Sequence, residues 1–517
     1  MAGLLTSCRR GRCFAARHLV AVRVCLIGAV FALLAQGAGA QVQAAIHTPA
    51  RSALAARFSL AAGSQAIPRS AFGLSVEYNE FATYEREGAI FDRVIKLIRP
   101  QDGSRMLLRL GGKSADRTYY QARPLKPAPF SHPVGPQWLQ ALSSTVASNR
   151  LRVMLDLNLV VHSPALAVGF AQAARQALPR GSLAGLEIGN EPDLYWRQTW
   201  LDKERVATTI PGTPLDWSRA YSASAYRRDY IAYAQALLKG VPDIPIGGPE
   251  IISAKPQWLS AIEGLGPDDP SFLTIHRYAS SNCWPTTSPN YPTIPLLLSE
   301  DSAAGFASTT SGAAAFAHSR RQALRLTEVN SISCGGNPGV ADSFAAALWA
   351  PDALLELIRA GADSVTWHIR PDPGSLNAPF LPQGSGIRVM PELYGLAVFA
   401  DMTGPGARIL NSRLSSAAGL HLKAWAVRFG GKLRVLLTNK GPRASNVALH
   451  LGPAGLAYVR RLSAPAVGSK TGVTFGGQSI GSTGQWEGQR VQTVVHGSGG
   501  VYRVELPGYS AALVGAR

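Results

Sequence analysis

The sequence predicts an α/β protein in which a (β/α)8 TIM barrel is followed by a C-terminal all-β sandwich domain. Between residues 71 and 402, eight short apolar runs alternate with longer segments whose apolar residues recur at helical spacing. After residue 403 the pattern changes to short alternating strands separated by glycine-rich turns. The chain has 517 residues, 46% of them hydrophobic, which is enough for a large core and excludes a disordered or collagen-like chain.

The predicted barrel strands are the eight apolar runs Phe72–Tyr78, Met106–Leu110, Leu151–Leu157, Ala184–Ile188, Ile244–Gly247, Phe272–His276, Ala323–Thr327 and Ser364–His368. Helices are predicted between them, among others over Tyr84–Ile98, Pro164–Leu178, Arg219–Lys239 and Ser343–Ala360. Strands that alternate with helices pair in parallel through right-handed crossovers, and eight of them fit a closed barrel. The competing fold is an open doubly wound sheet, but no glycine-rich phosphate loop follows the first strand.

Residues 403–517 are predicted to form the β-sandwich domain. Its candidate strands are His421–Phe429, Leu433–Thr438, Val447–Leu451, Ala457–Leu462 and Val501–Leu506. A separate N-terminal segment, residues 41–70, contains one strand-like stretch at Arg57–Ile67. We expect that this stretch can pair with the C-terminal sheet.

The first 40 residues resemble an export signal. Five arginines without an acid precede the apolar stretch Val24–Leu34, and Ala38-Gly39-Ala40 then offers a small-residue cleavage site before Gln41. The apolar stretch is short for a membrane span. We therefore expect an exported protein, periplasmic or extracellular, with no integral membrane segment. The mature chain keeps two cysteines, Cys283 and Cys334, which either pair or remain buried thiols.

The charge balance is strongly basic. Lys and Arg number 51 against 32 Asp and Glu, a formal net charge of +19. Such a balance favours acidic partners: a polyanionic sugar, a nucleic acid or a membrane surface. Charge alone does not choose among them.

The residues with the clearest chemistry are two glutamates at predicted strand ends. The fourth apolar run leads into Asn190-Glu191-Pro192, and the seventh leads into Thr327-Glu328-Val329. In a (β/α)8 barrel the carboxyl ends of the strands carry the catalytic residues, so both carboxyl groups should face one mouth. Glycosidic cleavage needs such a pair, one protonated to release the leaving oxygen and one ionised to attack or stabilise the anomeric carbon. The alternative for each glutamate alone is an ordinary acid in a turn.

At this point the chain resembles the clan A glycoside hydrolases and, more narrowly, glycoside hydrolase family 79, the β-glucuronidase and heparanase family. The narrower resemblance rests on short stretches that recur in order: Gly73–Tyr78, Leu108–Asp116, Asp156–Leu159, Ile275–Tyr278, Glu328–Gly336 and Leu506–Leu513. It covers nearly all of the mature chain. It implies a barrel with a C-terminal β-domain and the activity of a retaining β-glycosidase.

The resemblance also implies roles for individual residues. Glu191 corresponds to the general acid/base and Glu328 to the nucleophile. Asn190 would bind the sugar 2-hydroxyl, and Tyr278 would hold Glu328 in position. Gly335 and Gly336 would present backbone N–H groups to a uronate carboxylate. Glu77 would contact the distal hydroxyls of the sugar, unless it pairs with Arg109 or another base.

The sequence departs from the family pattern at two places. Lys113 stands where many relatives have a small polar residue, and it either supplies positive charge to the sugar site or is an exposed loop lysine. Near the eighth strand, where a tyrosine helps hold the uronate carboxylate in relatives, this chain has Trp367, which lacks the hydroxyl. Both changes concern which sugar is recognised rather than which type of reaction is catalysed.

The sequence thus predicts an exported retaining β-glycosidase that hydrolyses β-linked glucuronic acid by double displacement. The alternatives are an endo-acting, heparanase-like enzyme, a clan A glycosidase acting on a neutral sugar, and an inactive carbohydrate-binding protein. We expect no metal or organic cofactor, since no zinc-ligand spacing occurs. We expect a carbohydrate as partner, containing uronic acid, no nucleic acid, and a monomer.

Overall fold

The protein is described here by a computed structural model that covers residues 54–123, 131–196, 221–371, 376–452 and 455–516. The predicted export signal lies outside these residues.

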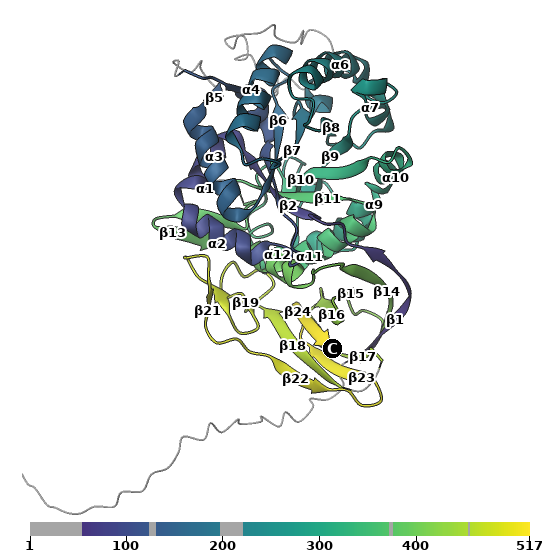
Figure 1. The fold of residues 1–517 in the computed structure, drawn as a ribbon. Helices are drawn as coiled ribbons and strands as arrows, with labels where there is room; N and C mark the ends of the chain where they lie inside the picture. The colour runs from purple at the N-terminus through teal and green to yellow at the C-terminus, as the bar shows by residue number, and fades with distance from the viewer. Residues whose placement is uncertain (1–53, 124–130, 197–220, 372–375, 453–454, 517) are drawn as a thin grey trace, which may run out of the picture. The chain divides into compact units, whose positions relative to one another are not determined.

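Eight parallel strands form the barrel, with the order β7-β6-β3-β2-β11-β10-β9-β8 (Figure 1). They are β2 (Phe72–Glu77), β3 (Leu107–Gly111), β6 (Arg152–Leu157), β7 (Leu183–Ile188), β8 (Gly247–Ile251), β9 (Phe272–Ser281), β10 (Ala323–Ser333) and β11 (Ser364–Ile369). The last strand, β11, pairs with the first, β2, and a single bridge between Leu186 and Ile246 joins β7 to the segment before β8. The barrel prediction is confirmed, and the open doubly wound sheet is excluded.

Helices connect the barrel strands. They are α1 (Tyr78–Arg86), α2 (Gly88–Ile98), α3 (Pro136–Asn149), α4 (Pro164–Ala177), α6 (Ala223–Gly240), α7 (Pro256–Ala261), α8 (Ile294–Leu297), α9 (Phe306–Ser308), α10 (Ser311–Ser319), α11 (Phe344–Arg359) and α12 (Glu392–Asp401), with short helical turns including Gly112–Arg117 and Pro192–Leu194. The single helix expected over residues 84–98 is two helices, which meet at the non-helical Glu87 before Gly88. The fifth strand is predicted over Ile244–Gly247 but lies further along the chain, because the hydrophobic pattern does not mark Gly248, Pro249 and Glu250 as strand residues.

The C-terminal domain is built on one ten-stranded sheet with the order β19-β18-β24-β16-β15-β14-β1-β17-β23, with β22 paired to β18. Its strands are β1 (Leu54–Ala66), β14 (Arg408–Ser416), β15 (Leu422–Phe429), β16 (Lys432–Asn439), β17 (Ser445–His450), β18 (Leu456–Ser463), β19 (Thr474–Phe475), β22 (Thr493–His496), β23 (Val501–Leu506) and β24 (Ser510–Ala516). Three short pairs stand apart: β4 (Thr118–Tyr120) with β5 (His132–Val134), β12 (Phe380–Gln383) with β13 (Gly386–Val389), and β20 (Ser479–Ile480) with β21 (Trp486–Glu487).

The sheet folds over on itself into two layers. Alternate residues of β16, β18 and β24 share one core with residues of β1, β17 and β23. The first strand of the described chain, β1, is antiparallel to β14 and parallel to β17. The strand expected at residues 57–67 is therefore a central strand of the C-terminal sheet, although it precedes the barrel in the sequence.

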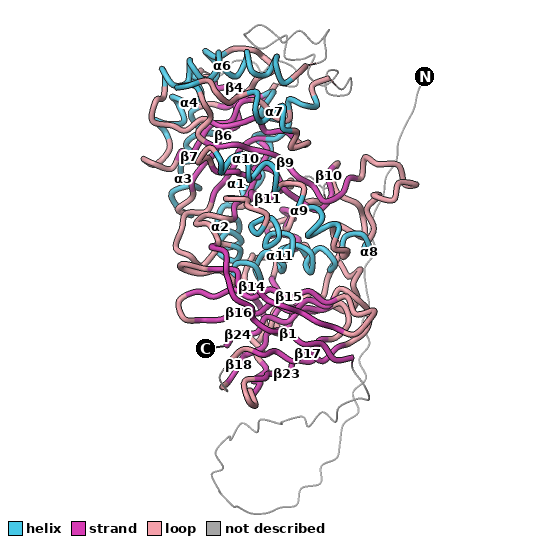
Figure 2. The backbone as a smooth tube through the Cα atoms, turned by 90° about the vertical axis from the view of Figure 1, so that its right-hand side faces the viewer, coloured by secondary structure: helices cyan, strands magenta, loops and turns pink. Residues whose placement is uncertain are grey.

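The other face of this sheet packs on the barrel through α11, as Figure 2 shows. The buried Asp352 of α11 accepts hydrogen bonds from the Trp425 indole of β15 (2.7 Å) and from the Lys440 ammonium after β16 (2.6 Å). Lys423 of β15 pairs with Glu356 of the same helix (2.7 Å). The barrel and the β-domain therefore share apolar and ionic contacts.

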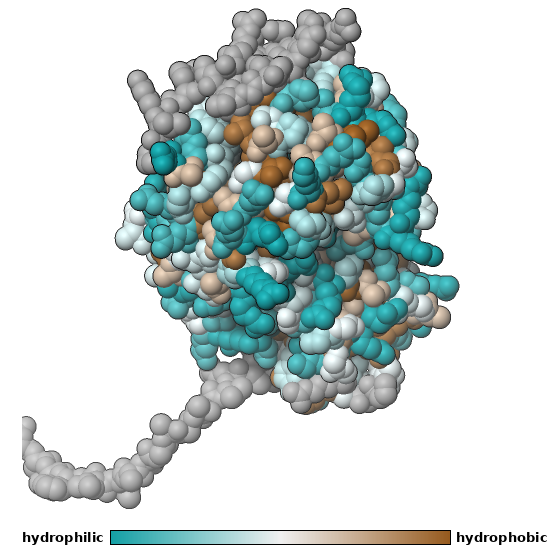
Figure 3. Space-filling view, turned by 45° about the horizontal axis from the view of Figure 1, so that its top comes forward, coloured by the Kyte–Doolittle hydropathy of each residue, from teal (hydrophilic) through white to brown (hydrophobic). Residues whose placement is uncertain are grey.

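Hydrophilic side chains dominate the face seen in Figure 3, with smaller hydrophobic patches in its upper half. None of the helices in the described ranges combines the length and the apolar character needed to cross a bilayer.

Candidate active site

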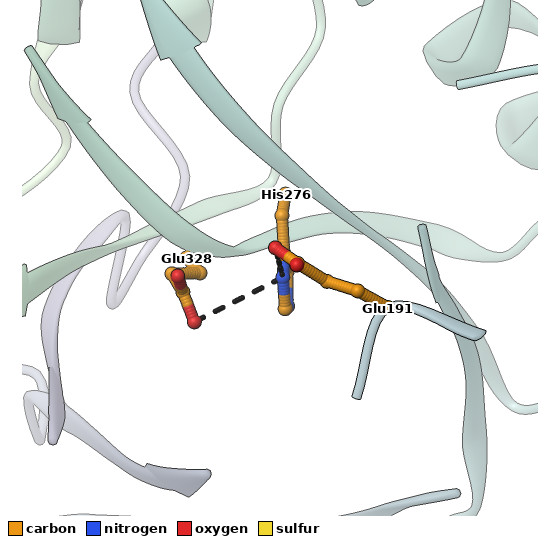
Figure 4. Close-up of side chains that lie close together, drawn as sticks. All are labelled: Glu191, His276 and Glu328. Carbon is orange, nitrogen blue, oxygen red and sulfur yellow. Dashed lines mark hydrogen bonds and ion pairs between the residues drawn. The ribbon is translucent and has the colours of Figure 1, made fainter. Parts of the chain in front are cut away.

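Two glutamates meet at the carboxyl ends of the barrel strands. Glu191 lies three residues after the end of β7, in a turn where its own backbone is left-handed (φ 51°). Glu328 lies within β10, which bulges against β9 between Leu326 and Glu328, so that Glu328 lies opposite His276. A bulge changes the direction of the side chains that follow it. One oxygen of each glutamate and a ring nitrogen of His276 lie within 4.8 Å of one another (Figure 4).

His276 lies between the two carboxyl groups. Its Nδ1 atom is 3.1 Å from Oε1 of Glu191 and 3.9 Å from Oε2 of Glu328. The imidazole is fully buried at the carboxyl end of the apolar part of β9. His276 therefore contacts one glutamate directly and acts electrostatically on the other.

The surroundings of Glu328 favour its ionised form. The Tyr278 hydroxyl donates to Oε1 of Glu328 (2.7 Å), and Nη1 of Arg109 donates to Oε2 (3.2 Å). Burial acts to raise the pKa of Glu328, but the charges of His368, His276 and Arg109 and the tyrosine hydrogen bond outweigh it and hold the pKa well below the usual carboxyl value. Glu328 is thus an anion at neutral pH.

The surroundings of Glu191 favour its protonated form. Burial raises its pKa, the hydrogen bond with His276 lowers it, and the negative charge of Glu328 raises it again, with a net upward shift. The two carboxyl groups therefore differ in the direction of their pKa shifts. Such a difference is the one expected of an acid at Glu191 and a nucleophile at Glu328.

Arg109 connects the catalytic glutamates to a buried acidic layer inside the barrel. Its guanidinium donates to Glu328 and Ser75 through Nη1, to Asp156 (3.2 Å), Glu250 (3.1 Å) and Asn190 (3.3 Å) through Nη2, and to Glu187 (3.1 Å) through Nε. Arg109 is fully buried. A single guanidinium, with its five N–H donors in a fixed plane, therefore orients side chains from several strands of the barrel.

The single positive charge of Arg109 cannot neutralise all of these buried acids, and their pKa values are shifted in different directions. Burial holds the pKa values of Asp156 and Glu250 well above the usual carboxyl value. For Glu187 burial acts in the same direction, but hydrogen bonding to Glu250 and the charge of Arg109 outweigh it and lower the pKa. The layer therefore favours the ionised form of Glu187 and the protonated forms of Asp156 and Glu250.

Sequence reasoning missed most of this network, although signals for it exist. Arg109 is a charged residue in the middle of the apolar run Leu108–Leu110, which is unusual unless the charge is paired inside the protein. Glu250 is a charged residue directly before the last residue of the fifth strand. His368, from β11, contacts Ser75 through Nδ1 (3.2 Å) and lies 3.7 Å from Glu328.

Asn190 and Glu77 lie at the same mouth. The side-chain oxygen of Asn190 accepts the hydrogen bond from Arg109, which leaves its amide group as the donor for a ligand. Glu77 ends β2 and accepts a hydrogen bond from the backbone N–H of Ser114 (2.7 Å). The suggested pairing of Glu77 with Arg109 is wrong, because other carboxylates occupy that guanidinium.

The glycine pair follows the end of β10. Both Gly335 and Gly336 are left-handed, with φ of 83° and 82°, and a Cβ atom on Gly336 would lie 2.9 Å from Cβ of Leu376. Glycine is therefore required at Gly336 on steric grounds. The preceding Cys334 forms a disulfide with Cys283 in the segment after β9, and this bond ties the two loops together.

The two departures from the family pattern occupy different environments. Lys113 is exposed in the helical turn that follows β3, next to the segment that contacts Glu77. Trp367 is fully buried, and its ring packs on Trp349 of α11 at 5.4 Å between centroids. Trp367 therefore belongs to the layer between barrel and helices and does not stand in for a tyrosine at the sugar site.

The trio of Glu191, His276 and Glu328 also has the composition of a metal site. However, Glu328 already accepts hydrogen bonds from Tyr278 and from the permanent cation of Arg109. A second cation would have to displace or oppose these donors. The donor set therefore fits a catalytic carboxylate pair better than it fits a metal ion.

A closed barrel with two facing glutamates and an attached β-domain is the architecture of glycoside hydrolases of the barrel type. More particularly, residues 424–513 match the glycosyl hydrolase family 79 C-terminal beta domain, which confirms the resemblance to family 79. None of the curated protein sequences matches this chain significantly.

Solved structures show the same fold over most of the chain. A 4-O-α-L-rhamnosyl-β-D-glucuronidase from Fusarium oxysporum 12S is similar with a TM-score of 0.72 and 19% identity, over 89% of this chain and 99% of the other. An α-L-arabinofuranosidase from Thermotoga maritima is similar with a TM-score of 0.61 and 12% identity, over 90% and 99% of the two chains. A family 51 arabinofuranosidase from Xanthomonas axonopodis pv. citri is similar with a TM-score of 0.59 and 13% identity, over 90% and 100%.

Proposed function

We propose that this protein is an exported, retaining β-glycosidase that hydrolyses terminal β-linked glucuronic acid. The observation that carries the proposal is the pair Glu191 and Glu328, whose nearest oxygens lie within 4.8 Å. Retaining enzymes keep their carboxyl groups about 5–5.5 Å apart, whereas inverting enzymes leave about 6.5–9.5 Å for a water molecule. The short separation favours retention.

The reaction would proceed in two steps. Glu328 attacks the anomeric carbon, and Glu191 gives its proton to the leaving oxygen, which produces a glycosyl ester on Glu328. Esterification removes the negative charge that helps to raise the pKa of Glu191. The pKa of Glu191 then falls, which suits its second role as the base that deprotonates the attacking water.

Recognition of a uronate rests on the loops around the mouth. The adjacent left-handed glycines Gly335 and Gly336 form the kind of backbone turn whose N–H groups can bind a carboxylate. Arg370, directly after β11, acts electrostatically on Tyr278 and His368 and so adds positive charge at this side of the mouth. The name of the Fusarium glucuronidase, which has the same fold, agrees with this substrate class.

Export is proposed from the N-terminal signal pattern together with the disulfide between Cys283 and Cys334. Disulfides persist in oxidising compartments such as the periplasm or the exterior. A carbohydrate substrate and a monomeric state complete the proposal.

The test is hydrolysis of a panel of aryl β-glycosides by the wild type and by the variants Glu191→Gln and Glu328→Gln. Glu263→Gln serves as a matched control, because Glu263 pairs with Arg320 and has no part in the site. We expect release from the glucuronide alone, loss in both site variants and normal activity in the control.

The anomer formed first, followed by proton NMR, tests the mechanism separately. A β-product that appears first supports retention, and an α-product contradicts it. Hydrolysis of a neutral aryl glycoside would be consistent with the proposed catalytic pair but would contradict the proposed substrate.

A further inference from the structure

A basic groove lies on the β-domain, and none of the site residues described above lines it. Its volume is about 290 Å³, and it is lined by Lys432 and Arg434 of β16, Tyr458 and Arg460 of β18, Leu513, Gly515 and Ala516 of β24, and Arg490 and Gln492 ahead of β22. These residues are called the basic groove below. Nothing in the proposed catalytic mechanism uses them.

The sheet register explains why the cations converge. In the strand order β18-β24-β16, Tyr458 and Arg434 both pair with Gly515, so they flank it on either side. A Cβ atom at Gly515 would lie 2.6 Å from Nη1 of Arg434. The missing side chain at Gly515 therefore makes room for the Arg434 guanidinium, which lies over this residue, while Tyr458 is its neighbour on the other side.

Positive charge is in excess in the groove. Asp401 at the end of α12 pairs with Arg460 at 2.5 Å, while the lining includes four cations. Burial lowers the pKa of Arg434, and the like charges of Arg460 and Arg490 lower it further. An anionic group in the groove would relieve this repulsion.

The groove also offers an apolar surface suited to sugar rings. Tyr458 is 40% exposed, and its neighbours Leu456 and Val494 are exposed as well. An aromatic ring can pack against the apolar face of a pyranose while its hydroxyl remains in water. The concave shape suits a narrow chain better than a flat lipid surface.

We propose that the basic groove is a second carbohydrate-binding site that holds an acidic polysaccharide through its carboxylate or sulfate groups. The choice of a glycan over other polyanions rests on the proposed function. Bound there, the chain of a polymeric substrate stays attached to the enzyme while its end is processed in the barrel.

The test is binding of a long oligoglucuronate to the Glu328→Gln protein, with a neutral cello-oligosaccharide as the control ligand. The groove variant is Lys432→Ala with Arg490→Ala, two exposed residues, and the matched control is Arg57→Ala with Arg503→Ala on β1 and β23. We expect about tenfold weaker binding in the groove variant only, and binding that weakens as salt increases.

Hydrolysis of a small aryl glucuronide by the groove variant on an otherwise wild-type chain should be unchanged, since it needs only the barrel site. The proposal would be overturned if the groove variant and the control variant lost binding equally, or if the protein bound the neutral cello-oligosaccharide with equal affinity. It would also be overturned if the protein preferred phosphatidylglycerol vesicles or single-stranded DNA. If the protein hydrolyses no glucuronide yet binds the oligoglucuronate through the groove, the catalytic proposal fails and this one stands.

Discussion

Tyr278→Phe tests how the nucleophile is kept ionised. The substitution removes the hydroxyl that donates to Oε1 of Glu328 at 2.7 Å and leaves the ring in place. A hydrogen bond to a charged group contributes about 1.5–3 kcal/mol, and one pKa unit corresponds to about 1.4 kcal/mol. The pKa of Glu328 should therefore rise by about 1–2 units.

The sign of the pH effect follows from the direction of this shift. Glu328 must be ionised to attack, so activity is lost as the pH falls through its pKa. Because Tyr278→Phe raises that pKa, the acid limb of the kcat/KM profile should move to higher pH by the same amount. The charges of His368, His276 and Arg109 remain, so the limb should stay below neutral pH.

The assay is the pH dependence of kcat/KM on an aryl glucuronide, with Tyr291→Phe as a matched control. Tyr291 donates to Asn282 in the loop after β9 and contacts neither glutamate. At the plateau, loss of positioning should lower kcat/KM by up to about 10²-fold. An acid limb that does not move, or that moves to lower pH, would refute the reasoning, because a purely structural role for Tyr278 would not shift it.

Three further predictions follow from other contacts. Lys440→Met leaves the fully buried Asp352 without its ion-pair partner and should destabilise the protein by about 3–5 kcal/mol; a change below about 1 kcal/mol in urea denaturation would contradict this. Cys283→Ser opens a disulfide that spans 51 residues and should lower the free energy of unfolding by about 2–4 kcal/mol. The KM for the glucuronide should rise because the adjoining glycine loop loosens. An unchanged melting temperature would contradict the effect on stability. His276→Ala removes a hydrogen bond that lowers the pKa of Glu191. The basic limb of the kcat/KM profile should therefore move to higher pH, and a shift to lower pH would contradict this prediction.

The catalytic pair illustrates what local sequence can reveal. A polar residue that follows an apolar run is visible without any tertiary information, and strand ends in a barrel meet at one mouth. For this reason Glu191 and Glu328 could be predicted together, and the structure brings them together. The bulge in β10 that turns Glu328 toward His276 has no such marker in the sequence.

Local sequence is enough to predict the alternation of strands and helices, the change to β-structure after residue 403 and the positions of the acids at strand ends. These features depend on periodicity and on neighbours along the chain. Only the folded chain shows which charges share Arg109, that Cys283 pairs with Cys334, and that cations of β16, β18 and the segment before β22 line one groove. These arrangements depend on burial and on contacts between residues far apart in the chain. A charged or polar group that loses its hydration on burial must find a partner inside the protein, and local sequence does not say which one.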